Sequence, residues 1–178
     1  GVSPSVGVMT FGGNNVGFES VVTMCLNPFL PFGCADEGFF TTKLNEVRNL
    51  EGTLAQTYRR AWAALNTPSM REGRSGEYAP LVVLAYPKVT WDPKQGNCQL
   101  QFTPAELVVA DSIGGTLNSS IENAVLSVHG QGYGVYYVDQ VEDAVRPDNT
   151  LCEDGDAAYI NGWKVRWSKG SQAYSESV

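Results

Sequence analysis

The sequence shows a convincing apolar stripe with helical spacing at only one place. This single helix narrows the possible fold classes more than any other feature of the chain. The stripe lies near residues 53–66, and its members recur three or four positions apart: Leu54, Tyr58, Ala61, Trp62 and Leu65. Thr53 with Gln56 fits a capping box, and Thr67-Pro68 ends the segment. A parallel α/β sheet needs a helix between successive strands, so a single helix disfavours that architecture.

Most other apolar segments are short and resemble β-strands, many with the two-residue alternation of a half-buried strand. Turns rich in Gly, Pro and Asn separate them, and they lie at residues 6–11, 16–25, 38–44, 80–91, 97–102, 106–110, 121–129, 132–141 and 157–168. The last segment divides at Asn161-Gly162, the preferred pair for a two-residue type I′ hairpin turn. After that turn Trp163, Val165 and Trp167 share one face, which we expect to enter the core.

These segments together predict a mainly β fold. Many short strands with one helix favour an antiparallel two-sheet β-sandwich, jelly-roll-like, with an α-helix inserted near 53–66. A length of 178 residues suits one compact domain, and no linker or internal repeat divides the sequence. We therefore expect residues 1–178 to form a single β-sandwich domain.

The charge content excludes some classes of partner. Charged residues make up 17% of the chain, against about 25% in an average protein, which favours a surface that partly faces neighbouring subunits. The net charge of −7 disfavours binding to nucleic acid or to an anionic membrane surface, since both depend on Lys and Arg. No apolar stretch reaches the length of about 18 residues that a membrane span requires.

The four cysteines leave two interpretations open. Cys25 and Cys34 bracket a proline-rich loop and form a plausible local disulfide, whereas Cys98 and Cys152 are distant in sequence and would meet only through the fold. The alternative is four buried free thiols, because cysteine is a common small core residue. No CxxC pair occurs, so the zinc-ribbon and thioredoxin-like classes are excluded.

No residue pattern forms a decisive catalytic signature. His129 is the only histidine, so any nucleophilic triad would have to use it, and the chain contains no GxSxG elbow. The glycines at 130–134 precede a strand-like segment rather than the helix that a phosphate-binding loop needs. Acidic clusters such as Asp36-Glu37 are interpreted as solvated turn charges. We therefore expect no catalytic residue, no cofactor and no metal.

Two other segments stand out as sites of contact or modification. The loop at 26–33 is apolar and is stiffened by two prolines, and exposed loops of this kind mark protein interfaces. Its predicted interface residues are Pro28, Phe29, Leu30, Pro31 and Phe32. Asn118-Ser119-Ser120 is a glycosylation sequon, which matters if the chain enters a secretory pathway.

The β plan, the low charge and the missing catalytic pattern favour a non-enzymatic structural or recognition domain. The leading hypothesis is a viral capsid or spike subunit that assembles with copies of itself or other coat subunits and attaches to a host receptor or glycan, in a virion or extracellular setting. The alternative is a secreted lectin-like module whose aromatic residues stack on sugars. A lesser alternative is an extracellular hydrolase using paired carboxylates or His129.

Overall fold

A computed structural model describes residues 3–17, 20–21, 24, 35–87, 103–141, 164–165 and 175–176. In chain order its elements are β1 (Gly7–Met9), the 3-10 turn η1 (Gly13–Val16), α2 (Glu37–Arg48), α3 (Glu51–Leu65), α4 (Pro68–Glu72), β2 (Leu81–Leu84), α5 (Pro104–Gly130), β3 (Val135–Val138), β4 (Lys164–Val165) and β5 (Ser175–Glu176). None of the helices in these ranges is long and apolar enough to cross a membrane.

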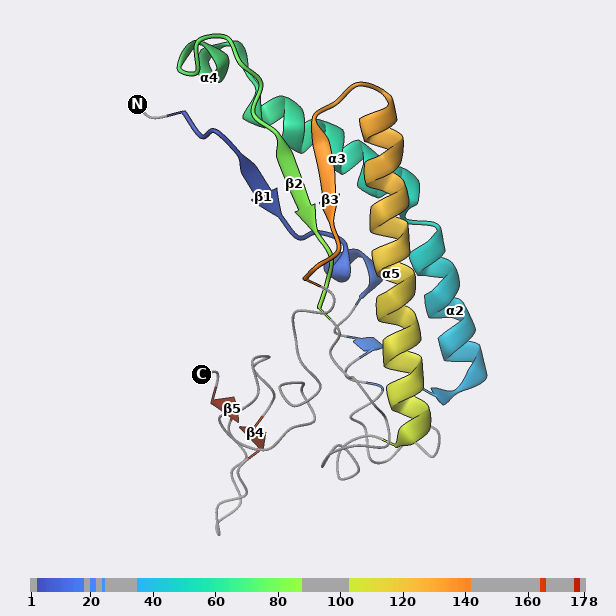
Figure 1. Cartoon of the computed structure of the whole chain (residues 1–178). Helices are drawn as coiled ribbons and strands as arrows, with labels where there is room; N and C mark the ends of the chain where they lie inside the picture. Colours follow the sequence, from blue (N-terminus) through green and yellow to red (C-terminus); the bar gives the residue numbers. More distant parts are fainter. Residues whose placement is uncertain are drawn as a thin grey trace.

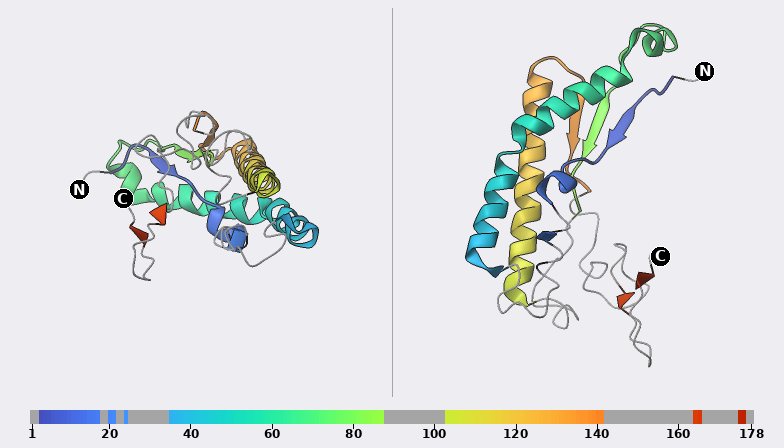
Figure 2. Two further views of the ribbon diagram at one scale, coloured as in Figure 1. Left: turned by 90° about the horizontal axis from the view of Figure 1, so that it is seen from below. Right: turned by 180° about the vertical axis from the view of Figure 1, so that it is seen from behind.

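The centre of the fold is a parallel sheet in the order β1-β2-β3, with its strands side by side and pointing the same way (Figure 1). Gly7 pairs with Leu81, and Leu81 in turn pairs with Val135. Helices α2 and α3 connect β1 to β2, and α5 connects β2 to β3. Seen from below and from behind, α3 and α5 lie against the same face of the sheet (Figure 2).

The core lies between that face and the helices. Leu81, Val83 and Val135 alternate with more exposed strand neighbours and are at most 4% exposed. They meet a helical layer of fully buried side chains that includes Val47 of α2, Leu54 and Tyr58 of α3, and Ile121, Val125 and Val128 of α5. Burial of this apolar surface, at roughly 25 cal/mol per Å², is the main stabilising contribution.

This architecture corrects the predicted antiparallel sandwich. The helix expected near 53–66 is present as α3, but α2, α4 and α5 accompany it, and the strands of the central sheet are parallel. The segments 6–11, 80–91 and 132–141 do contain β1, β2 and β3. A parallel sheet with crossover helices is the arrangement that the apparent scarcity of helices had disfavoured.

The prediction of strands at 106–110 and 121–129 is wrong, because both segments belong to α5. This helix begins with a complete capping box: Thr103 accepts a bond from the Glu106 backbone N–H at 3.3 Å, and the Glu106 carboxylate accepts from the Thr103 N–H at 2.7 Å. Pro104 stands in the first turn, where its missing N–H has no cost. A strong start of this kind fixes the helix from its first residue.

The strand predicted at 38–44 is likewise helical and lies in α2. Asp36 is the N-cap of this helix, since its carboxylate accepts a bond from the Phe39 backbone N–H at 3.0 Å. In the segment predicted as a strand at 16–25, the described residues form no strand. The Asn161-Gly162 turn and the segment 97–102 lie outside the described residues, while Lys164–Val165 pairs antiparallel with Ser175–Glu176.

Candidate functional site

The carboxyl ends of β1, β2 and β3 open at one edge of the sheet, the edge at which open α/β sheets bind their ligands. Residues 10–17, here called the β1 loop, leave β1 at this edge. Within the loop Gly12, Gly13 and Val16 are buried, whereas the side chains of Asn14 and Asn15 are exposed. The loop therefore presents two side-chain amides from a backbone that is anchored in the core.

Two glycines allow the β1 loop to lie directly on the core. Gly12 has a φ of +135°, a conformation that other residues rarely adopt, and a Cβ there would stand 3.2 Å from Leu117. A Cβ on Gly13 would stand 2.9 Å from the Tyr86 hydroxyl. Gly12 is therefore fixed by its backbone conformation, and a side chain at position 13 would have to displace the Tyr86 hydroxyl.

Two tyrosine hydroxyls hold the same stretch of backbone. Tyr58 donates to the Phe11 carbonyl at 3.2 Å, and the Gly13 N–H donates to the Tyr86 hydroxyl at 2.9 Å. Burial, followed by the proximity of Tyr86 and Tyr137, raises the pKa of Tyr58 well above its ordinary value, so this hydroxyl keeps its proton and remains a donor. Phe11 and Gly13 are therefore fixed from two directions.

Asn118 of α5 fixes Tyr86 in turn. Its side-chain oxygen accepts from the Tyr86 backbone N–H at 2.8 Å, and its amide nitrogen donates to the Tyr86 carbonyl at 2.9 Å. Asn118 is only 6% exposed, so in the folded chain the predicted glycosylation nitrogen is buried and bonded. The structure thus gives this asparagine a structural role.

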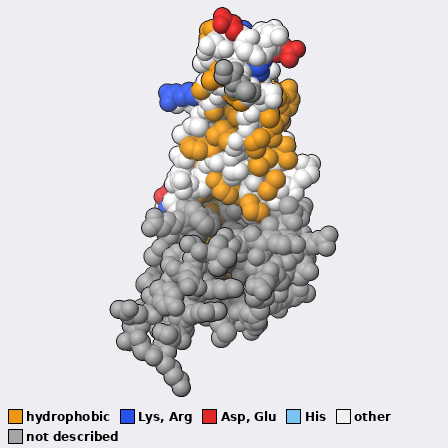
Figure 3. All heavy atoms as spheres, turned by 90° about the vertical axis from the view of Figure 1, so that its left-hand side faces the viewer, with side chains coloured by type: hydrophobic (Ala, Val, Ile, Leu, Met, Phe, Trp, Pro, Cys, Tyr) orange, Lys and Arg blue, Asp and Glu red, His pale blue; other side chains and the backbone are white. Residues whose placement is uncertain are grey.

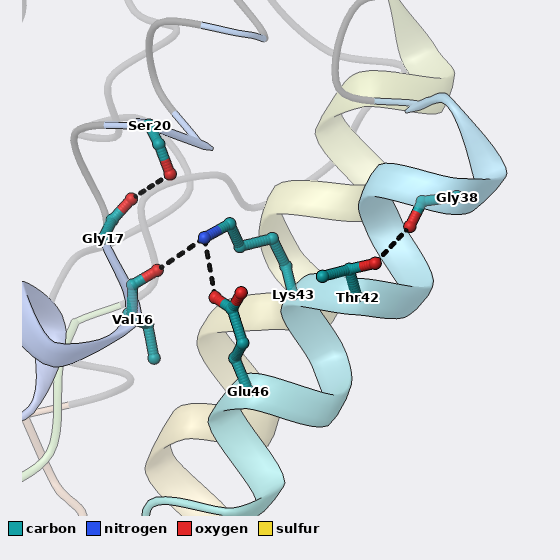
Figure 4. Close-up of polar contacts among 7 residues, drawn as sticks. All are labelled: Val16, Gly17, Ser20, Gly38, Thr42, Lys43 and Glu46. Atoms are coloured by element: carbon teal, nitrogen blue, oxygen red, sulfur yellow. Dashed lines mark hydrogen bonds and ion pairs between the residues drawn. The ribbon is translucent and has the colours of Figure 1, made fainter.

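The far end of the β1 loop is attached to α2 (Figure 4). The Lys43 ammonium donates to the Val16 carbonyl at 3.4 Å and pairs with the Glu46 carboxylate at 2.7 Å. Gly17 follows with a φ of +61°, and its carbonyl accepts a bond from the Ser20 hydroxyl at 2.7 Å. The loop is thus held at both ends while Asn14 and Asn15 stay free to face a ligand.

These features define what the edge can do chemically. Side-chain amides and backbone N–H groups on a fixed backbone at the end of a strand are suited to bind a carbonyl oxygen and to stabilise negative charge that develops on it. Asp139 and Gln140 follow β3 at the same edge and are exposed. Among the described residues no group of three or more His, Cys, Asp or Glu side chains is placed to hold a metal ion.

Of the other residues singled out in the sequence, His129 and the glycines at 130–134 lie away from this edge. His129 is at the end of α5, beside the amino end of β3, where its Nδ1 lies 3.1 Å from the Val135 carbonyl. The glycines at 130–134 connect α5 to β3, and Gly132 has a φ of +88°. Pro28, Phe29, Leu30, Pro31, Phe32 and all four cysteines, including Cys25 and Cys34, lie outside the described residues.

The sequence analysis missed the β1 loop because residues 12–15, between the segments predicted as strands at 6–11 and 16–25, fit a Gly- and Asn-rich turn of an antiparallel sheet. Such a turn carries no functional implication. The available signal was an apolar strand followed at once by two glycines and two exposed amides, which is significant only where the strands are parallel. The site was therefore missed together with the topology.

Two solved structures share this fold. Phospholipase A1 from Streptomyces albidoflavus NA297 matches 97% of this chain and 63% of its own, with 24% sequence identity and a TM-score of 0.63. An extracellular lipase from Streptomyces rimosus matches 90% of this chain and 59% of its own, with 18% identity and a TM-score of 0.56. The chain thus spans less than two thirds of the length of either enzyme.

No protein-family model and no curated protein matches the sequence. The structural likeness nevertheless overturns the capsid or spike hypothesis, since that hypothesis depended on a jelly-roll sandwich. It also removes the β-sandwich plan on which the expectation of a non-enzymatic domain rested in part, and the two solved structures described above are enzymes.

Proposed function

We propose that the protein is an extracellular ester hydrolase that acts on lipid substrates. The observation that carries the proposal is the β1 loop, whose backbone is fixed at the carboxyl edge of the sheet and presents the exposed amides of Asn14 and Asn15, in a fold shared with a phospholipase A1 and a lipase. Attack on an ester carbonyl places negative charge on its oxygen, and donors already in position stabilise that charge without reorganisation. In this proposal the β1 loop supplies such donors.

Asn14 and Asn15 are the residues to which we assign this role. Their side chains are exposed beside a backbone that Tyr58, Tyr86 and Lys43 hold in place. The single histidine does not share this edge, because His129 lies at the amino end of β3. Among the described residues the edge therefore offers the donor half of a hydrolytic site, and no serine–histidine pair accompanies it.

The test is ester hydrolysis by the protein made from its complete coding sequence, with p-nitrophenyl esters and phosphatidylcholine vesicles as substrates. Asn14→Ala and Asn15→Ala remove the two exposed amides, and Asn45→Ala removes an exposed amide on α2 as the matched control. Losing a donor of this kind typically lowers kcat by about 10²–10³. We expect at least one loop variant to show that loss and the control to retain full activity.

Two results would contradict the proposal. One is that the folded wild-type protein hydrolyses neither the p-nitrophenyl esters nor the phosphatidylcholine. The other is an unchanged kcat in both loop variants, which would separate any ester hydrolysis from the β1 loop.

A further inference from the structure

A pocket of about 590 Å³ lies at the amino end of the sheet, at the opposite end from the β1 loop. This amino-end pocket is lined by aromatic side chains and by backbone that precedes β2 and β3, including Trp62, Tyr78, Pro80, Gly132, Gly134 and Tyr136. Small-molecule sites have similar volumes and a similar lining of aromatic side chains with a few polar groups. The proposed ester hydrolysis at the β1 loop leaves this pocket without a role.

Gly134 keeps the space between two of the aromatic side chains open. A Cβ at this position would stand 3.2 Å from Trp62 Nε1 and 4.0 Å from Tyr136 Cε2. Gly132 has a positive φ, which favours glycine, but Gly134 does not. The space between Trp62 and Tyr136, rather than the backbone conformation, therefore accounts for the glycine at 134.

Two polar groups of the amino-end pocket can make a further hydrogen bond. The Trp62 Nε1–H is buried and has no partner among the described residues, and an unpaired buried donor is destabilising. The Tyr78 hydroxyl accepts a bond from the Arg71 guanidinium at 3.0 Å, so its own hydrogen is left to donate. A ligand that carries oxygen acceptors would pair with both groups.

The exposed aromatic rings add a preference for the shape of the ligand. Tyr78 and Tyr136 are 57% and 48% exposed, although both line the pocket. A sugar ring carries C–H bonds on its faces and hydroxyls around its rim. The C–H faces suit the partly negative faces of aromatic rings, and the hydroxyls supply the acceptors that Trp62 and Tyr78 lack.

The lining carries no charge, which favours a neutral ligand. None of the described residues that line the amino-end pocket has a charged side chain. Seen from the β1 side, hydrophobic side chains cover much of the described surface, and charged ones lie mostly toward its margins (Figure 3). The ligand is therefore expected to be recognised by its ring and its hydroxyls rather than by an ion pair.

Other ligands that aromatic rings bind fit this pocket less well. An acyl chain would leave the Trp62 N–H without an acceptor. A quaternary ammonium would be repelled by the Arg71 guanidinium, which lies 4.8 Å from the centre of the Tyr78 ring. A nucleic-acid base would bring phosphates toward a chain of net charge −7.

We propose that the amino-end pocket binds a neutral sugar ring, carried either by a glycolipid headgroup or by a soluble glycan. The ring packs on Tyr136, and its hydroxyls pair with the Trp62 N–H and the Tyr78 hydroxyl. Because the pocket and the β1 loop lie at opposite ends of the sheet, a bound sugar leaves the carboxyl edge free. The proposal does not rest on the hydrolase function.

Two binding measurements test the proposal and distinguish the two sources of the sugar. Protein made from the complete coding sequence is mixed with phosphatidylcholine vesicles that contain or lack digalactosyldiacylglycerol. In a second series it is titrated with soluble oligosaccharides of glucose, galactose and mannose. A glycolipid headgroup as ligand predicts tighter binding to the vesicles that contain it, and a soluble glycan predicts binding of a free oligosaccharide.

Variants locate the sugar in the amino-end pocket. Gly134→Ala fills the space between two rings, and Tyr136→Ala removes one ring, so each should weaken sugar binding by about tenfold. The matched controls are Gly52→Ala, where a Cβ meets open space, and Leu126→Ala, at a side chain 58% exposed on α5. Both controls should bind sugar as the wild type does.

The indole resonance of Trp62 gives a direct readout. It is assigned by its absence from the NMR spectrum of Trp62→Phe, and it should shift when sugar binds because the N–H gains an acceptor. An unmoved resonance would overturn the proposal, as would the lack of sugar binding in both series, or an unchanged affinity in both Gly134→Ala and Tyr136→Ala. None of these measurements uses ester hydrolysis, so the outcome is independent of the hydrolase proposal.

Discussion

The two ends of the sheet use polar and aromatic groups in opposite ways. At the carboxyl end, polar side chains clamp a loop so that the amides of Asn14 and Asn15 remain exposed. At the amino end, the rings pack on one another: Trp62 stacks on Tyr78 with centroids 5.3 Å apart and meets Tyr133 edge-on at the same distance. The carboxyl end therefore exposes polar groups to solvent, whereas the side chains at the amino end contact one another.

Asn66 shows how fully the amino end is used for structure. It is 7% exposed, and its side-chain oxygen accepts bonds from the Ala79 N–H at 2.7 Å and from the Arg74 guanidinium at 2.8 Å. Its amide nitrogen donates to the Trp62 and Ala79 carbonyls. Arg74 also reaches the Pro4 carbonyl at 2.8 Å, which ties the start of the described chain to this network. The comparison implies that mutations at the amino end change stability, whereas those at the carboxyl end change activity.

The largest expected effect on stability is at Asn66. Asn66→Ala leaves the buried Ala79 N–H without its acceptor and removes one of the acceptors of the Arg74 guanidinium, which we expect to lower the free energy of unfolding by about 3 kcal/mol. Urea denaturation measures the loss, with Asn123→Ala, at an exposed position of α5, as the control. The kcat of the remaining folded protein should be unchanged; a large fall in kcat would show that the two ends are not functionally separate.

Local pattern predicted part of this fold and misled elsewhere for a definite reason. The α3 stripe and the apolar runs of β1, β2 and β3 are visible in short windows of sequence. In α5 a short window is deceptive, because Ala124, Leu126 and Val128 alternate as in a strand. The structure buries Ala124 and Val128 and leaves Leu126 58% exposed, which fits the helical spacing of Ile113, Leu117, Ile121 and Val125 instead.

The site could not follow from sequence without the topology. Gly12 has a φ of +135° and lies against Leu117, about a hundred positions away, and the bond at Gly13 comes from Tyr86, 73 positions away. No local pattern contains those distances. The exposed amides of Asn14 and Asn15 acquire meaning only when β1 is known to be parallel to its neighbour.

An intermediate effect is expected at Tyr86, where the comparison predicts a fall in activity together with a small loss of stability. Tyr86→Phe removes the acceptor of the Gly13 N–H and should lower stability by about 1 kcal/mol. Because the β1 loop is then held less firmly, we expect Tyr86→Phe to lose a similar amount of transition-state stabilisation. This loss corresponds to a fall in kcat of about tenfold, and we expect a smaller change in KM. Exchange of the Gly13 amide hydrogen, followed by NMR, should accelerate because that bond is lost.

Tyr133→Phe at the amino end is the matched control, since it keeps the ring that meets Trp62. Its kcat and the exchange of Gly13 should equal those of the wild type. Unaltered Gly13 exchange in Tyr86→Phe would show that the hydroxyl does not hold the loop, whatever reaction the protein performs.

The smallest effect is expected at Lys43, which holds the outer end of the β1 loop. Its bond to the Val16 carbonyl is long, at 3.4 Å, and its partner Glu46 is 46% exposed, so solvent screens the ion pair. Lys43→Met should lower the free energy of unfolding by about 0.5 kcal/mol at low salt. The difference between the variant and the wild type should shrink in roughly 0.5 M NaCl, because the added ions screen the Lys43–Glu46 ion pair. Urea denaturation at the two salt concentrations measures both values, with Glu46→Gln as the partner variant. A loss as large as that of Asn66→Ala, unchanged by salt, would show that the carboxyl end depends on buried polar contacts as strongly as the amino end does.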